Sequence, residues 1–249
     1  MKPQRDRRDD EPAFVLHTYA YRETSMIVEA FTEHHGRMAM VARGARRPRS
    51  ELRGILQAFQ PLALSWAGAA ELKTLVKAEW RGGLALPGGA ALLCGFYLNE
   101  LLLKLLPRED PHPALWTAYA SALHSLTTKP QAAAQSATLR QFEVRLLAEA
   151  GYALPLTRDA DTGAPIDADQ RYDYVFDRGP RLHAAEPRLQ GPVVRGATLI
   201  ALATDRYPDA DVASEAKRLM RGILDHYLEE RRIFSRRVVQ DLAALEDDR

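Results

Sequence analysis

Residues 13–42 carry the sequence AFVLHTYAYRETSMIVEAFTEHHGRMAMVA, and this stretch decides the fold. Its apolar and β-branched residues concentrate at 13–19, 25–32 and 37–42, with polar and glycine-containing segments between them. Short runs of this composition, bounded by turn residues, are typical of β-strands. We therefore predict three consecutive strands, the second and third joined by a turn at His34-His35-Gly36.

Two more strands are expected downstream, at residues 55–66 and 71–80, with Gly68 in the turn between them. Pro61 interrupts the fourth strand, which suggests a sheet edge or a bulge because proline lacks the N–H donor. Five short strands within about 70 residues suffice for a small closed or nearly closed barrel. The natural candidate is the five-stranded OB-fold, which binds single-stranded oligonucleotides on one face.

The segment between the third and fourth strands, residues 43–54, has the sequence RGARRPRSELRG, with five arginines and one glutamate. Gly44, Pro48 and Gly54 exclude a continuous helix through it. Clustered arginines repel one another, and a polyanion such as nucleic acid would neutralise them. The segment predicts a nucleic-acid-binding loop; a surface loop kept soluble by its charge is the alternative that the sequence leaves open.

The composition limits the chemistry. The chain has 249 residues and a formal net charge of +1, so a polyanion site would be a local patch. The single cysteine, Cys94, excludes an intrachain disulfide and a cysteine zinc site. No phosphate-binding glycine motif occurs, and the histidines lack the spacing of metal ligands. We therefore expect no catalytic site, no metal and no cofactor.

The N-terminal residues 1–11 have mixed charge and no apolar core, so we expect them to be disordered and not a signal peptide. The longest apolar run, residues 84–106, contains Asn99, Glu100 and Lys104, which argues against a membrane span. Both features predict a cytoplasmic protein.

The second half of the chain predicts a helical domain. Glycines and proline in residues 81–89 mark a linker between a barrel at 12–80 and a helical bundle at 90–246. A polar insertion at residues 157–188 is expected to hold a small β-hairpin at 172–176 and 181–183. The apolar periodicity predicts helices at 90–106, 111–127, 131–150 and 213–228, and Ser235 predicts the cap of a last one through 245.

Several motifs, in order, resemble the bacterial recombination mediator RecO family. In the barrel these are AFVLH at 13–17, ETS at 23–25, FTE at 31–33, HGR at 35–37, VARGAR at 41–46, LQAFQPL at 56–62 and KTL at 73–75. In the helical region they are YLNEL at 97–101, LRQFE at 139–143, GY at 151–152, YPDA at 207–210 and SR at 235–236.

The resemblance implies an N-terminal OB-fold, a C-terminal helical domain and no catalytic activity. It also implies binding of single- and double-stranded DNA, annealing of complementary strands, and binding of the C-terminal tail of the single-stranded-DNA-binding protein SSB. With RecR, such proteins help RecA to replace SSB on gapped DNA, so a nucleoid-associated location is expected. Many members carry four zinc-binding cysteines, whereas residues 156–187 contain none, as in the zinc-free branch.

The expected DNA-binding residues come from the basic loop and the neighbouring strands. Lys73 and Lys77 lie four residues apart, a spacing that would place both on one face of the fifth strand. Tyr19, Phe31, Phe59 and Trp66 are expected either to stack on bases or to fill the barrel core. The predicted DNA-binding set is Arg37, Arg43, Arg46, Arg47, Arg49, Arg53, Lys73 and Lys77. An RNA-binding or protein-bridging adaptor on the same fold remains the alternative.

The expected SSB-tail site lies between the helices at 131–150 and 213–228. An acidic tail with an apolar tip needs an apolar pocket with cations at its rim. Arg140 is the first choice for the carboxylate contact. The alternative is that the apolar residues are ordinary core and that the arginines are solvated. The predicted set is Arg140, Phe142, Arg145, Leu146, Arg218 and Arg221.

Overall fold

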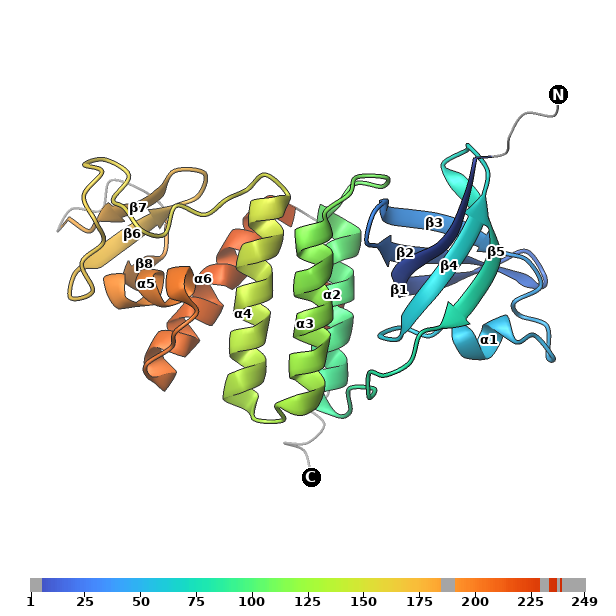
Figure 1. Ribbon diagram of the computed structural model, residues 1–249. Coiled ribbons are helices and arrows are strands. Elements are labelled where there is room, and N and C mark those ends of the chain that lie inside the picture. Colours follow the sequence, from blue (N-terminus) through green and yellow to red (C-terminus); the bar gives the residue numbers. More distant parts are fainter. Residues whose placement is uncertain (1–5, 185–190, 229–232, 237, 239–249) are drawn as a thin grey trace. The chain divides into compact units, whose positions relative to one another are not determined.

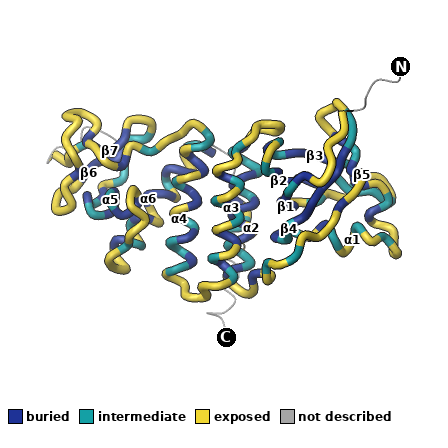
Figure 2. The backbone as a smooth tube through the Cα atoms, in the orientation of Figure 1, coloured by how far each residue is buried: buried dark blue, intermediate teal, exposed yellow. Residues whose placement is uncertain are grey.

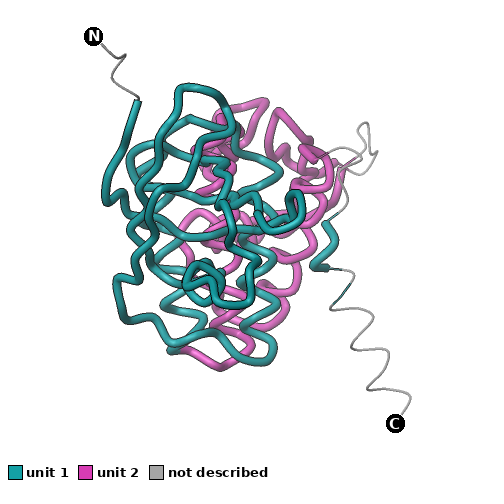
Figure 3. Tube along the Cα trace, turned by 90° about the vertical axis from the view of Figure 1, so that its right-hand side faces the viewer, with its two compact units in different colours: residues 1–128, 233–249 teal, residues 129–232 magenta. Residues whose placement is uncertain are grey.

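The computed structural model describes residues 6–184, 191–228, 233–236 and 238. It divides into two compact units, one formed by Met1–Thr128 with Ile233–Arg249 and the other by Lys129–Arg232 (Figure 3). We call them unit 1 and unit 2 and describe each by itself.

Unit 1 contains the predicted five-stranded barrel, which is OB-like. Its strands are β1 (Arg7–Tyr21), β2 (Ser25–Thr32), β3 (Gly36–Ala42), β4 (Pro61–Ala67) and β5 (Leu72–Trp80). They close in the order β1-β2-β3-β5-β4, with β3 and β5 parallel and the other pairs antiparallel (Figure 1). The expected fold class is thereby confirmed.

Side chains alternate between the inside and the outside of the barrel, as the period of a β-strand requires. Val28, Ala30 and Met40 are fully buried in the barrel core. Phe31, on the opposite face of β2, packs outside the barrel against the ring of Tyr119, with ring centroids 6.1 Å apart.

The first strand begins earlier than expected, at Arg7, so the disorder predicted for residues 1–11 is wrong for residues 7–11. Residues 1–5 of that prediction lie outside the described part of the chain. The early start follows from pairing with β4, in which Arg7 lies opposite Ala67 and Glu11 opposite Leu64. The local sequence at residues 7–11 is a run of mixed charges, and it does not show that this segment pairs with a strand more than 50 residues away.

The fourth strand begins later than expected, at Pro61 and not at residue 55. Residues Leu52–Ile55 form the short helix α1, whose Leu52 and Ile55 side chains pack against the barrel core. Phe59 then adopts a positive φ of 70°, which an extended strand cannot contain. Tertiary packing of apolar side chains therefore overrides the strand propensity of this segment.

Two helices, α2 (Ala90–Leu105) and α3 (Pro113–Thr128), belong to unit 1, although the sequence placed them in a separate helical domain. The turn between them packs tightly on the barrel. The Glu109 N–H donates to the Arg37 carbonyl at 2.9 Å. A Cβ on Gly36, which has a φ of +69°, would lie 2.0 Å from the carbonyl oxygen of Asp110.

A buried polar chain also fastens α2 and α3 to β1. Asn99 donates from Nδ2 to the Leu16 carbonyl at 2.9 Å and accepts a hydrogen bond from the Tyr119 hydroxyl. Phe14 packs edge-on against the Tyr119 ring, with centroids 5.2 Å apart. Because the contacts of Asn99 with Leu16 and of Tyr119 with Phe14 join α2 and α3 to β1 across the linker, the linker glycines do not mark the boundary of the compact unit.

Unit 2 combines helices with a small sheet of order β7-β6-β8. Strands β6 (Arg171–Val175) and β7 (Gly179–Leu182) are the expected hairpin. Strand β8 (Val193–Arg195) and helix α5 (Gly196–Thr204) were not predicted. Three residues are too few to show a period, and α5 is apolar on most faces. The remaining helices are α4 (Ala132–Glu149) and α6 (Ala210–Leu228).

The predicted last helix, residues 235–245, lies mostly outside the described residues; Phe234, Ser235 and Arg236 are helical. The Phe234 and Ser235 N–H groups donate to the Glu100 carboxylate on α2, at 2.7 and 2.8 Å. Burial alone would raise the pKa of Glu100, but these backbone hydrogen bonds outweigh it and lower the pKa.

The polar segment that precedes β6 is organised by one buried carboxylate. Asp159 accepts hydrogen bonds from the N–H groups of Asp161, Thr162 and Leu182, at 3.0, 2.8 and 2.6 Å. Burial raises the pKa of Asp159, but the hydrogen bonds from Thr162 and Leu182 outweigh it and lower the pKa. Within the described ranges, no group of three or more His, Cys, Asp or Glu side chains has the geometry of a metal site. Nor is any described helix long and apolar enough to span a membrane.

Candidate nucleic-acid interface

The basic loop between β3 and β4 presents its arginines to solvent. The loop backbone is held at its start, where the Arg46 N–H donates to the Thr24 carbonyl at 2.8 Å, and at its end, where α1 packs on the core. Among the described residues, no carboxylate forms an ion pair with any loop arginine. All five are exposed (Figure 2): Arg43, Arg46, Arg47, Arg49 and Arg53.

A sixth arginine joins them from the β1–β2 turn. The Arg46 guanidinium donates to the Arg22 carbonyl at 3.2 Å, which places the two residues side by side. Arg22 is exposed, and its guanidinium lies 5.2 Å from the centroid of the Tyr21 ring. We call Arg22, Arg43, Arg46, Arg47, Arg49 and Arg53 the arginine patch.

Sequence reasoning missed Arg22 because Glu23 follows it and 20 residues separate it from the loop. The antiparallel register, in which Met26 pairs with Ala42, brings the start of β2 beside the end of β3. That register is the signal that would have found it.

Arg37 is not part of the patch, although the sequence predicts it among the DNA-binding residues. Its Nε–H donates to the Leu106 carbonyl at 3.1 Å and its Nη1 to Glu29 at 3.2 Å. The side chain is 15% exposed. Burial lowers the pKa of Arg37, and the neighbouring Glu29 carboxylate acts in the opposite direction. Arg37 therefore holds the α2–α3 turn on the barrel.

Lys73 and Lys77 do not share a face, contrary to prediction. Leu75 pairs with Trp66 and Lys77 with Ser65, so Val76 is an extra residue in a β-bulge that shifts the alternation. Lys73 is buried, with its ammonium 2.8 Å from a Glu109 carboxylate oxygen.

Lys77 is exposed and lies 2.9 Å from Glu79. The hydrogen bond to Glu79 raises the pKa of Lys77. Both lysines thus have carboxylate partners, unlike the loop arginines.

Most of the aromatic candidates for base stacking fill the interior. Phe31, Phe59 and Trp66 are at most 3% exposed, so the stacking role considered for them is wrong. Trp66 fills the barrel core, as the alternative assignment expects, whereas Phe31 and Phe59 are buried outside that core, against the rings of Tyr119 and Phe96. Tyr19 differs, since it is 47% exposed on β1.

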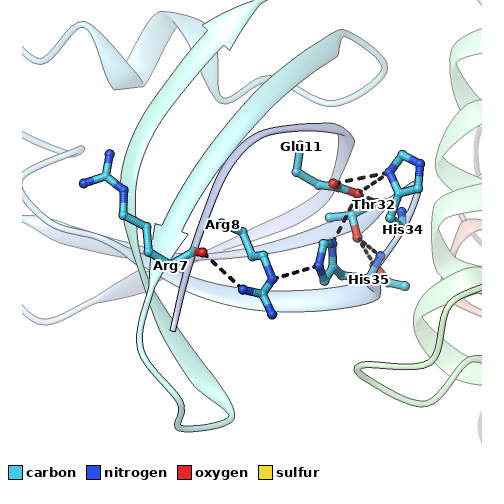
Figure 4. Close-up of polar contacts among 7 residues, drawn as sticks. Arg7, Arg8, Glu11, Thr32, His34 and His35 are labelled. Atoms are coloured by element: carbon cyan, nitrogen blue, oxygen red, sulfur yellow. Dashed lines mark hydrogen bonds and ion pairs between the residues drawn. The ribbon is translucent and has the colours of Figure 1, made fainter. Parts of the chain in front are cut away.

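The N-terminal arm of β1 forms a separate polar cluster at the β2–β3 turn (Figure 4). The Glu11 carboxylate, which is 9% exposed, accepts the His34 N–H at 2.7 Å. The Arg8 Nε–H donates to His35 Nε2 at 3.1 Å. The Thr32 hydroxyl accepts the His35 N–H and donates to the Gly36 carbonyl. These bonds fasten the arm to the turn, and they engage Arg8 away from the arginine patch.

The residues predicted for the SSB-tail site divide into buried and exposed groups. Phe142 and Leu146 are at most 2% exposed and belong to the core of unit 2. Arg140 is 6% exposed and forms two hydrogen bonds with the Glu143 carboxylate. Phe142 and Leu146 therefore do not line an open apolar pocket. They are ordinary core residues, which is the alternative that the sequence left open. Arg145, which lies 3.1 Å from Glu149, and Arg218 and Arg221 are the exposed members.

An open cavity of about 830 Å³ lies elsewhere in unit 2, beside the connection from α5 to α6. Burial raises the pKa of Tyr207, and the charges of Asp205 and Glu143 act in the same direction, whereas that of Arg140 acts against them. The sequence did not predict this cavity, because its lining comes from a helix that shows no amphipathic period. It is lined by Ala168, Ala197, Ile200, Ala201, Thr204, Arg206, Tyr207 and Pro208.

The fold and the arginine patch define a class, that of OB-type barrel proteins with an exposed arginine-rich surface, here continued by a helical region. The chain belongs to the RecO family. The family model for the recombination protein O N terminal matches residues 9–84, and the model for its C terminal matches residues 88–237.

Curated relatives named "DNA repair protein RecO" match over nearly the whole chain. The protein of Aromatoleum aromaticum is 49% identical over 243 residues, 97% of this chain and 99% of that protein. The protein of Azoarcus sp. (strain BH72) is 48% identical over 246 residues, again 97% and 99%. That of Dechloromonas aromatica is 48% identical over 242 residues, with the same coverage.

Proposed function

We propose that this protein is a non-catalytic recombination mediator that binds single- and double-stranded DNA and anneals complementary strands. As a member of the RecO family, it acts in DNA repair and recombination. The observation that carries the finer proposal is the arginine patch. It gathers six exposed arginines on an OB-like barrel. The other arginines and lysines on the barrel strands have carboxylate partners: Arg7, Arg8, Arg37, Lys73 and Lys77.

The patch suits annealing because that reaction requires neutralised phosphates and unpaired, accessible bases. Guanidinium groups on a short loop contact phosphates without reading base edges, so the affinity is independent of sequence. The loop backbone is anchored by Arg46 and by α1, which keeps the arginines together in the unbound protein. Two strands that both bind this surface are brought together with less mutual repulsion.

The test is charge reversal of Arg43, Arg46, Arg47 and Arg49 to glutamate. If four phosphate contacts are lost, the slope of log affinity against log salt becomes shallower by about 2.8 for single strands, at roughly 0.7 per contact. Annealing of complementary DNA strands, measured without nucleotide, should fall in parallel. The matched control reverses four arginines of unit 2 and changes the net charge equally: Arg145, Arg178, Arg218 and Arg221.

An unchanged salt slope in the folded patch variant would refute the DNA-binding assignment. The competing assignment, an RNA-binding or protein-bridging adaptor, predicts that the wild-type protein does not anneal DNA strands. Annealing with and without SSB therefore separates the two assignments directly.

We further propose that unit 2 binds the SSB tail. With RecR, the protein would then help RecA to replace SSB on gapped DNA. An acidic tail with an apolar tip requires an apolar cavity beside cations. The cavity beside α5 supplies apolar walls at Ile200 and Ala201 and a cation at Arg206. Arg140 is hydrogen-bonded to the Glu143 carboxylate, so it can attract another carboxylate only in competition with Glu143.

A fluorescently labelled SSB-tail peptide, titrated by anisotropy, tests this partner. Arg140→Ala should weaken peptide binding by about 1.5–3 kcal/mol if Arg140 holds a charge-assisted bond. Arg206→Ala tests the rim of the cavity in the same way. Binding of DNA should stay intact in both variants. Equal loss of peptide and DNA binding, or loss of neither, would exclude this tail site.

A further inference from the structure

The outer face of β1 carries a row of aromatic side chains that ends at the arginine patch. A bulge at Leu16 changes the register, because Val15 pairs with Ala30 but His17 pairs with Glu29. Beyond the bulge, Tyr19 lies opposite Ile27 and Tyr21 opposite Ser25. These partners alternate with Val28, which lies in the barrel core, and Met26, which packs against that core, so the row faces out of the barrel. We call His17, Tyr19 and Tyr21 the aromatic edge.

The aromatic edge is accessible, and it has its own internal order. His17 is exposed and Tyr19 is 47% exposed. Their ring centroids are 4.5 Å apart in an edge-to-face arrangement with an interplanar angle of 64°. Tyr21 lies under the guanidinium of Arg22, a member of the arginine patch. The edge therefore runs continuously from exposed rings to exposed cations.

The exposure of the aromatic edge distinguishes it from the buried aromatic residues of the barrel. The buried aromatic residues of the barrel, Phe31, Phe59 and Trp66, cannot reach a ligand. The rings of His17 and Tyr19 remain at the surface, and the row that they begin ends at Tyr21, beside the exposed Arg22 of the arginine patch. Bases stack on aromatic side chains while basic residues hold the phosphates, which is the common design of single-strand sites.

We propose that the aromatic edge stacks unpaired bases of a single strand whose phosphates lie on the arginine patch. The inference rests on the proposed function. It adds that the ligand at this site is a single strand with unstacked bases. A duplex can meet the arginines with its phosphates, but its base faces are stacked on one another and do not reach Tyr19. The arginine patch thus supplies affinity for both forms, and the aromatic edge supplies preference for the single strand.

The test compares Tyr19→Ala and His17→Ala, alone and combined, with the conservative Tyr19→Phe. The probes are a labelled oligothymidine and a labelled duplex of equal length, at several salt concentrations. The combined variant should bind the single strand roughly tenfold more weakly or worse, because each stacked base contributes substantially. Its duplex affinity and its salt slope should equal those of the wild type, because no phosphate contact is removed. Tyr19→Phe should bind as the wild type does.

The control is Tyr152→Ala, which removes a tyrosine of unit 2 that is 42% exposed, and it should change neither affinity. Unchanged tryptophan fluorescence verifies the fold of unit 1, which contains Trp66, Trp80 and Trp116.

The two proposals fail in different ways. If the arginine reversal leaves binding intact, the proposed function is wrong. If the arginine reversal weakens both probes and the aromatic variants bind the single strand normally, only the stacking proposal is overturned. Equal weakening of the single strand and the duplex by the aromatic variants would also overturn it.

Discussion

Replacing Glu29 with glutamine should destabilise unit 1 by about 3 kcal/mol, the lower end for breaking a buried ion pair. The Glu29 carboxylate is 3% exposed and receives hydrogen bonds from Arg37 and Arg108. Glutamine keeps the size but removes the charge, and its amide N–H group then faces a guanidinium. The lower end applies because the two arginines are 15% and 34% exposed and regain some hydration.

The matched control is Glu71→Gln. Glu71 pairs with the same Arg108 but is 70% exposed, so its loss should cost less than about 1 kcal/mol. The pKa of Arg108 supports this ranking, because it is raised chiefly by the hydrogen bond to Glu29.

Guanidinium denaturation followed by tryptophan fluorescence is the assay, since all three tryptophans, Trp66, Trp80 and Trp116, lie in unit 1. The salt slope of DNA binding should stay unchanged in the folded Glu29→Gln protein, because Arg37 keeps its bond to the Leu106 carbonyl. A loss of stability no larger than that of Glu71→Gln would refute the reasoning.

Two other predictions concern single positions. Gly36→Ala should cost more than about 2 kcal/mol in the same denaturation assay, because the new Cβ meets the Asp110 backbone at 2.0 Å. Gly44→Ala, at nearly the same φ of +68°, should cost clearly less, because its new Cβ would meet only the flexible Arg47 side chain, at 3.5 Å; equal losses would contradict the close-contact argument. The folded-state pKa of Asp159 is lowered, so its stabilisation is present above its unfolded pKa of about 3.9 and is lost as the pH falls through the folded value. Asp159→Asn should therefore lose about 1.5–3 kcal/mol near neutral pH and show a weaker acid dependence by circular dichroism; an unaltered pH profile would count against this role.

The sequence by itself determined the features that depend on local periodicity. The apolar runs at residues 25–32 and 37–42 predicted β2 and β3, and the helical period at 213–228 identified α6. It also identified the basic loop, because glycine, proline and arginine without an apolar period have few other structural uses. The order of the motifs pointed to the RecO family, and the family comparison bears this out.

Only the tertiary structure decided which cations face the solvent. Lys73 and Arg37 belong to the predicted basic set, yet the turn between α2 and α3 buries both beside carboxylates. Arg22 joined the patch through the pairing of β2 with β3, and the bulge at Val76 moved Lys77 to another face. The physical reason is the distance along the chain between the residues that interact. Alternation is set by neighbouring residues, whereas bulges, strand partners and ion pairs depend on segments far apart in the chain, whose approach no local pattern records.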